Sequence, residues 1–275
     1  MGFITVDVDK CKRDGICVRD CSPAILRLST QTGFPEVIPG SENACILCGH
    51  CVTVCPEGAL SHERMPVGAT APMNEKLAVA QTQAVQFLRS RRSVRVFENK
   101  PVEKDKVTRL IEVARYAPTA GNSQTVEWVV HSDPSRIDEI AATAVEWVRG
   151  LVTSDPSVAV TRPYLPRVVS RWDSGYDSVL RKAPVLIVAS APKEAAFGLV
   201  DLTIALSYLD LLAPTMGLGT CWAGLLEGAL LSSPSLREIA GIPKEHPYHY
   251  PMMLGYPTTK HYRLPERRPP KITFL

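Results

Sequence analysis

The 275-residue sequence has almost no excess of charge of either sign. Its 31 Lys and Arg residues are nearly balanced by 28 Asp and Glu residues, which leaves a formal net charge of +3. So small a charge argues against a nucleic-acid partner or an anionic membrane surface. Basic residues do gather at Arg89–Arg95 and Arg263–Lys271, and clusters of this size suit a single phosphate group better than DNA.

Segments for export or membrane insertion are also lacking. Met1–Lys10 has neither a basic start nor an apolar stretch, so we expect no signal peptide. The most apolar stretch, Phe197–Gly219, contains Asp201, Asp210 and Pro214, which predicts a buried helix instead of a bilayer span. We therefore expect a cytoplasmic protein with no membrane partner.

Cysteine is almost absent after Cys55. Of the eight cysteines, Cys221 alone lies beyond that point, and the other seven fall between Cys11 and Cys55. An odd, clustered set in a chain without an export signal argues against disulfides and in favour of metal ligands.

Composition separates three regions. Residues 1–64 are rich in cysteine and poor in long periodic stretches, which predicts a small metal-binding domain. Residues 65–76 contain Pro66, Gly68 and Pro72 and are predicted to form a linker. Residues 77–275 alternate between helical spacing and short apolar runs, which predicts a larger domain of helices and strands.

The alternation of helices and strands predicts an α/β or α+β layer structure for the larger domain, and the family resemblance described below implies the α+β class. Helices are predicted over Leu77–Arg91, Val102–Tyr116, Arg136–Val148 and Ala195–Ala213, and buried strands over Val126–Val130, Val185–Ala189 and Met252–Gly255.

The second half of the cysteine-rich region carries a specific spacing. Two, two and three residues separate consecutive cysteines in the run CILCGHCVTVCP, which contains Cys45, Cys48, Cys51 and Cys55. In bacterial ferredoxins with two clusters, three cysteines of such a run bind one cluster and the fourth binds the other. The region therefore resembles a two-cluster bacterial ferredoxin.

The first half of this region is a degenerate copy, with Asp14 where a second cysteine is expected. The crossing pattern predicts one [4Fe–4S] cluster on Cys21, Cys45, Cys48 and Cys51. It predicts a second cluster, [4Fe–4S] or [3Fe–4S], on Cys11, Cys17 and Cys55. Asp14 is either an oxygen ligand of that cluster or a solvated loop residue. Structural zinc is the competing hypothesis, but overlapping cysteine triplets fit one tetrahedral site poorly.

Four further motifs occur in the larger domain. They are RRSVRVF at Arg91–Phe97, APTAGNSQ at Ala117–Gln124, GLGTCWAG at Gly217–Gly224 and LGYP at Leu254–Pro257. In this order they resemble the nitroreductase family of FMN enzymes, from about Ala80 to the C-terminus.

The resemblance implies a set of FMN-binding residues. The first motif and one arginine of the basic tail, Arg267 or Arg268, would hold the phosphate, because guanidinium groups bind phosphate through paired hydrogen bonds. Asn122 and Gln124 would lie near the flavin ring, and the main chain of Ala223-Gly224 would approach flavin N5. The candidate cofactor-binding residues are Arg91, Arg92, Ser93, Arg95, Thr119, Asn122, Gln124, Ala223, Gly224, Arg267 and Arg268. No catalytic side chain is predicted.

Together these patterns predict an FMN-dependent oxidoreductase whose iron–sulfur clusters pass electrons to or from the flavin. The family resemblance implies a homodimer and a small acceptor such as a nitroaromatic, a quinone or an activated double bond. The electron donor would be ferredoxin or NAD(P)H, although a dinucleotide-binding fingerprint is lacking, because Trp222 stands where its third glycine is needed. The alternatives are a non-catalytic electron-transfer module of a larger redox complex and a zinc-stabilised regulatory protein.

Overall fold

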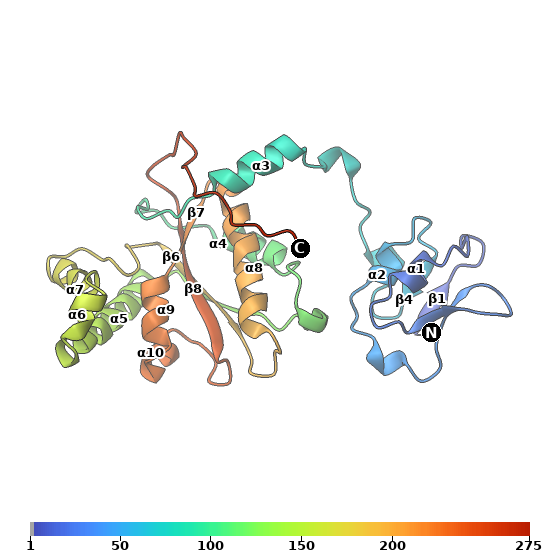
Figure 1. The fold of residues 1–275 in the computed structure, drawn as a ribbon, viewed down its shortest axis with the longest axis horizontal. Helices are drawn as coiled ribbons and strands as arrows, with labels where there is room; N and C mark the ends of the chain where they lie inside the picture. Colours follow the sequence, from blue (N-terminus) through green and yellow to red (C-terminus); the bar gives the residue numbers. More distant parts are fainter. Residues whose placement is uncertain (1–2) are drawn as a thin grey trace. The chain divides into compact units, whose positions relative to one another are not determined.

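The computed structural model describes residues 3–275, which form two compact units (Figure 1). The first comprises the described residues up to Val79 together with Gly121–Ser123, and the second comprises Ala80–Ala120 and Gln124–Leu275. Residues 65–76, the predicted linker, fall within the first unit.

The first unit repeats one local motif. The short helices α1 (Ile16–Arg19) and α2 (His50–Thr53) each follow a glycine in the left-handed region, Gly15 with φ 68° and Gly49 with φ 75°. Glycine adopts this conformation without a steric penalty, so each cysteine loop turns sharply into its helix. The helices pack on a small core that contains Cys17, Val52 and Leu60.

Short antiparallel strand pairs complete the first unit. Strand β1 (Ile4–Val6) pairs with β4 (Leu60–His62), and β2 (Leu26–Leu28) pairs with β3 (Pro35–Val37). The connecting segments contain the 3-10 helices η1 (Glu42–Ala44), η2 (Val67–Ala69) and η3 (Glu75–Leu77). Two of these, η2 and η3, include residues of the predicted linker.

The second unit is built on a four-stranded antiparallel sheet. Its strands β5 (Glu127–His131), β6 (Val185–Ala191), β8 (Tyr248–Gly255) and β7 (Gly219–Trp222) lie side by side in that order. The central strands β6 and β8 are almost entirely buried, which explains their apolar sequences. Antiparallel strands with helices on both faces confirm the α+β class.

Helices cover both faces of this sheet (Figure 1). On one face lie α4 (Lys104–Ala114) and α8 (Gly198–Leu212). On the other lie α5 (Pro134–Ser154), α7 (Leu165–Asp173), α9 (Gly224–Leu230) and α10 (Pro234–Ile239). The remaining helices are α3 (Gln81–Ser90), α6 (Ser157–Thr161), η4 (Ala120–Asn122) and η5 (Ala213–Met216).

The apolar helix expected over Ala195–Ala213 is α8, a helix of the protein core. Gly198–Met216 is the one helical stretch of residues 3–275 that is long and apolar enough to cross a membrane. Its residues Leu202, Leu206 and Leu209 are fully buried in the cluster that joins α8 to the sheet. Burial against β6 and β8 therefore explains the apolar sequence of α8.

Candidate flavin and iron–sulfur sites

The arginine motif runs along the edge of the second unit's sheet. The Val94 N–H donates to the Thr220 carbonyl in β7 at 2.8 Å, and the Glu98 N–H donates to the Tyr256 carbonyl at 2.8 Å. The segment Arg91–Phe97 is thereby held between β7 and the chain after β8. Three of the four motifs seen in the sequence, far apart along the chain, meet at this edge.

Gly219 allows this close approach. A Cβ atom at Gly219 would overlap the Val94 side chain, coming within 2.9 Å of the Val94 Cβ. Only glycine leaves room for the arginine motif to lie flat against β7.

Asp210 of α8 connects the arginine motif to β7. Its buried carboxylate accepts hydrogen bonds from the Thr220 hydroxyl and from the Trp222 indole N–H, the latter at 3.2 Å. The Arg91 guanidinium lies 3.5 Å from the same carboxylate. Asp210 therefore fixes the direction of the side chain expected to bind the FMN phosphate.

A second buried carboxylate of α8 holds the loop of the second motif. Asp201 accepts a hydrogen bond from the Ala120 N–H at 3.1 Å, while its other oxygen is buried without a partner among residues 3–275. The same loop is stabilised by the Thr119 hydroxyl, which accepts from the Gln124 N–H at 3.0 Å. Gln124 has a positive φ and an exposed side chain.

The other residues of the arginine motif surround Cys221. Burial raises the pKa of the Cys221 thiol, and the positive charges of Arg95 and Arg181 and a hydrogen bond with the Ser93 side chain offset part of that rise. A buried thiol with a raised pKa stays protonated at neutral pH and is a weak nucleophile. On the neighbouring Arg92, Nη1 is buried without a hydrogen-bond partner among residues 3–275.

At the start of α9, the N–H groups of Ala223 and Gly224 differ in whether they have a hydrogen-bond acceptor. The Ala223 N–H donates to the Pro251 carbonyl at 3.0 Å and is therefore occupied. Gly224 begins α9, and the first N–H groups of a helix have no acceptor within the helix. Of the two residues predicted to approach flavin N5, Gly224 is the one whose N–H is available.

Tyr250 is a site residue that the sequence did not reveal. Its hydroxyl would lie 3.5 Å from a Cβ atom placed on Gly224, and its ring meets Trp222 edge to face at 5.1 Å. Burial raises the pKa of the Tyr250 phenol, and the charge of Glu227 raises it further. The hydroxyl therefore stays protonated at neutral pH and is a hydrogen-bond donor beside Gly224.

The basic tail lies apart from these contacts. Arg267 and Arg268 are exposed, and within residues 3–275 Arg267 donates only to the adjacent Glu266 carbonyl, at 3.3 Å. Their predicted part in phosphate binding stays a prediction. The second unit has other donors that fit the phosphate of FMN, namely Arg91, Arg92 and Ser93. This set carries positive charge, and Arg92 Nη1 in it is buried without a partner among residues 3–275.

Asn122 belongs to the first unit, with Gly121 and Ser123. Its side-chain amide donates to the main-chain carbonyls of Ile46 at 2.9 Å and Leu47 at 3.0 Å. Both carbonyls lie between Cys45 and Cys48, so Asn122 stabilises the cysteine loop. A contact of Asn122 with the flavin stays a prediction.

Electrostatic coupling links the clustered thiols. Burial raises the pKa of the Cys51 thiol to about 11, and the nearby Cys21, Cys48, Cys45 and Cys17 raise it further, in that order. Burial also raises the pKa of the Cys17 thiol, with smaller contributions from Cys11 and Cys55. Cys51 is thus coupled to the other three cysteines of the first expected ligand set and also to Cys17 of the second, so the assignment of ligands to two clusters stays a prediction.

Asp14 has a structural partner. One oxygen of its carboxylate accepts from the Ile16 N–H at 3.0 Å, at the start of α1, and its main-chain carbonyl accepts from Arg19 at 2.8 Å. The side chain thus stabilises the turn that begins α1. No three His, Cys, Asp or Glu side chains in the described part of the chain are grouped closely enough to hold a single metal ion.

Comparison with known proteins identifies both parts of the chain. Residues 88–256 match the model of the nitroreductase family, and residues 41–60 match a 4Fe-4S binding domain. A putative NADH dehydrogenase/NAD(P)H nitroreductase of Archaeoglobus fulgidus is 22% identical over 175 residues, which are 64% of this chain and 86% of that protein.

Solved structures share the fold. A nitroreductase with bound FMN from Bacteroides fragilis is 21% identical with a TM-score of 0.58, and the match covers 74% of this chain and all of that one. A nitroreductase with bound FMN from Desulfitobacterium hafniense is 22% identical with a TM-score of 0.55, over 72% of this chain and all of that one. The resemblance inferred from the sequence is confirmed: the chain belongs to the nitroreductase family and carries a 4Fe-4S binding domain ahead of its nitroreductase domain.

Proposed function

We propose that this protein is an FMN-dependent oxidoreductase in which two N-terminal iron–sulfur clusters exchange electrons with the flavin and a small organic acceptor is reduced. When bound, FMN transfers a hydride or two electrons, and each cluster transfers one electron at a time. The single observation that carries the proposal is the meeting of three motifs at the β7 edge, where Asp210 orients Arg91.

The residues of the second unit divide the work of holding the cofactor. Arg91, Arg92 and Ser93 would bind the phosphate, with Asp210 as the group that positions Arg91. The free N–H of Gly224 would donate to the flavin ring, and Tyr250 would offer a proton donor beside it. Arg95, Thr119, Gln124 and one tail arginine complete the set that the family resemblance implies.

The first unit would hold the two clusters. Cys21, Cys45, Cys48 and Cys51 would bind one cluster, and Cys11, Cys17 and Cys55 the other. The coupling of Cys51 to Cys21, Cys48 and Cys45, and of Cys17 to Cys11 and Cys55, supports this assignment. Thiolates and thiols of this kind persist in a reducing compartment, which supports a cytoplasmic location.

The exposed face of α8 supports a homodimer. Leu199, Val200 and Tyr208 are 49%, 53% and 40% exposed, and Phe197, just before the helix, is 60% exposed. Large apolar side chains gathered on one side of a core helix are typical of a surface that another protein covers. A second copy of the chain is the partner that the family resemblance implies.

Anaerobic electron transfer tests the proposal. Replacing Cys48 with Ala removes one thiolate from one cluster, so we expect FMN to bind normally while its reduction by reduced ferredoxin falls to a small fraction of the original rate. Cys221→Ala is the matched control, because this thiol lies outside both groups. Flavin bleaching in Cys48→Ala at the rate of the unaltered protein would show that electrons reach FMN without the clusters, and would favour an electron-transfer module that serves another partner.

A further inference from the structure

A cavity of about 300 Å³ opens beside α7 in the second unit. Its polar lining consists of Tyr164, Arg167, Arg171, Ser178 and Arg181, and its apolar wall includes Leu225. Leu225 directly follows Gly224, so the cavity adjoins the start of α9, where the flavin ring is expected. Neither Asp nor Glu lines it.

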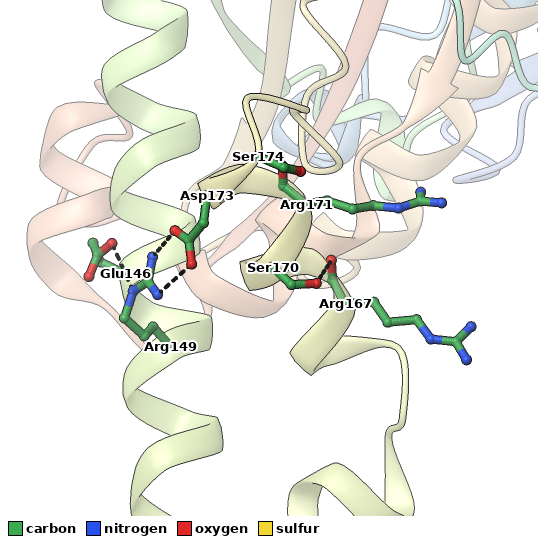
Figure 2. A network of polar contacts seen from close by, with 7 residues as sticks. All are labelled: Glu146, Arg149, Arg167, Ser170, Arg171, Asp173 and Ser174. Carbon is green, nitrogen blue, oxygen red and sulfur yellow. Dashed lines mark hydrogen bonds and ion pairs between the residues drawn. The ribbon is translucent and has the colours of Figure 1, made fainter.

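The arginines of α7 are not neutralised by the acidic residue of that helix. Asp173 accepts two hydrogen bonds from Arg149 of α5, at 2.7 and 3.1 Å, and Arg149 also contacts Glu146 at 3.2 Å. Figure 2 shows Arg167 and Arg171 extending from α7 away from this network, toward one side. Within residues 3–275, no carboxylate forms an ion pair with Arg167, Arg171 or Arg181.

The loop before β6 is shaped to present the third arginine. Arg181 and Lys182 have φ of 58° and 53°, a conformation that side-chain-bearing residues rarely adopt. The buried Asp177 imposes it by accepting the N–H groups of Val179, Leu180 and Lys182 at 2.8 to 2.9 Å. Strained backbone conformations cluster at functional sites, and here a buried carboxylate maintains the strain.

A buried hydroxyl in the lining also lacks a partner. Ser178 is 6% exposed, and its Oγ makes no hydrogen bond within the described residues. Buried hydroxyl groups in folded proteins almost always have a partner, so an unsatisfied one beside an arginine-lined cavity indicates a missing acceptor. An oxyanion would satisfy Ser178 and the guanidinium groups together.

We propose that this cavity binds the carboxylate of an aromatic electron acceptor, with Arg167, Arg171 and Arg181 on the carboxylate and the ring against Leu225. The inference rests on the proposed function, because it names the substrate class of that same site. Guanidinium groups bind carboxylates through paired hydrogen bonds, and the apolar wall suits a ring better than a free inorganic ion. Binding forms and breaks no covalent bond.

Two nitroaromatic probes of similar size separate the effect of charge from the effect of shape. 4-Nitrobenzoate carries a carboxylate where 4-nitrobenzyl alcohol carries an uncharged group. Calorimetric titration of the full protein with its flavin oxidised, and with no electron donor present, measures binding without turnover. We expect the acid to bind about ten-fold more tightly than the alcohol, as a desolvated charge-assisted contact requires.

Variants assign the effect to the cavity. Arg167→Gln and Arg171→Gln should each weaken acid binding about ten-fold and leave alcohol binding unchanged, which also shows that each variant is folded. Arg149→Gln is the matched control. It removes one guanidinium charge, but Arg149 binds Asp173 and does not line the cavity. Its acid affinity should equal that of the unaltered protein.

Four results would overturn the inference: equal affinities for acid and alcohol, an equal loss in Arg149→Gln, loss of flavin from Arg167→Gln, or displacement of the acid by NADPH and not by NADH. The third result would assign the cavity to the FMN phosphate, and the fourth to a phosphate of the donor. The titrations need no electron transfer, so failure of the Cys48→Ala test would count against the proposed function and leave these results to judge the cavity.

Discussion

The guanidinium of Arg91 lies 3.5 Å from the carboxylate of Asp210, which also accepts from the Thr220 hydroxyl and the Trp222 indole. One buried carboxylate thus joins α8, β7 and the arginine motif. Arg91 contacts Asp210 through Nη1, and a guanidinium has five N–H donors, so Asp210 orders Arg91 without consuming all of its donors.

Substitution of Arg91 should act through the phosphate. We expect Arg91→Ala to weaken FMN binding by about ten- to a hundred-fold and riboflavin binding by far less, because riboflavin lacks the dianion. Fluorescence titration of the flavin-free protein measures both affinities. Arg89→Ala on the exposed surface of α3 is the control and should change neither. Equal losses for both flavins would assign Arg91 a role in folding.

Substitution of Asp210 should reduce stability. Asp210→Ala leaves the Thr220 hydroxyl and Trp222 N–H without their acceptor, and we expect the free energy of unfolding to fall by about 2–4 kcal/mol. Asp210→Asn keeps an acceptor oxygen and should lose less. Urea denaturation followed by tryptophan fluorescence checks the order of the two variants, and equal stability of all three proteins would contradict the role assigned to Asp210.

The contact between Gly219 and Val94 predicts a rescue. Gly219→Ala should lower the free energy of unfolding by about 1–3 kcal/mol, because a Cβ atom there overlaps the Val94 side chain. Adding Val94→Ala removes the overlapping methyl groups and should recover part of the loss. A double variant no more stable than Gly219→Ala, measured by the same denaturation, would mean that Gly219 matters for another reason.

The cysteine groups predict the metal content. Protein prepared without oxygen should contain roughly seven or eight irons per chain, as two clusters require. Fewer than four irons with stoichiometric zinc would end the ferredoxin hypothesis.

Asp14→Cys should change the reduction potential if Asp14 binds iron, and should leave potential and spectrum unaltered if Asp14 only caps α1 through the Ile16 N–H.

The apolar surface of α8 predicts the assembly. We expect sedimentation to show a two-fold homodimer with two flavins, and Val200→Glu to shift it toward monomer by placing a charge in the interface. Glu112→Lys, an exposed change on α4, is the control. A flavin-loaded monomer of the unaltered protein would contradict the prediction.

Periodicity located the core of the fold, and its omissions have physical causes. Val185–Ala189 and Met252–Gly255 were expected as buried strands and lie within β6 and β8. A continuous apolar run can be recognised from the sequence alone, without knowledge of the strands beside it. Nothing predicted β7, because its four residues Gly219–Trp222 pair only with β8 and carry no alternation. No element was predicted between Val148 and Val185, although α7 lies there.

The cofactor motifs were visible in the sequence, but the residues that position them were not. In the sequence, Asp201 and Asp210 served only as evidence against a bilayer span. A buried carboxylate needs a partner, which was the available signal, yet the partners Ala120 and Arg91 lie too far along the chain to be paired by spacing alone. Tyr250 gave no signal, because its closeness to Gly224 depends on sheet geometry.

The two aspartates also limit how α8 can vary in length. They stand nine positions apart, and at 100° per residue their side chains leave the helix on opposite sides, about 180° from one another. Inserting one residue between them would turn one carboxylate by about 100° relative to the other and lengthen their separation by one residue's rise. Deleting one residue would turn it by the same angle in the opposite direction and shorten the separation. Either Ala120 or Arg91 would then lose its partner. A change of length between Asp201 and Asp210 would therefore disturb the contacts of the carboxylates, whereas a substitution on the exposed side of α8, such as Val200→Glu, leaves both carboxylates in place.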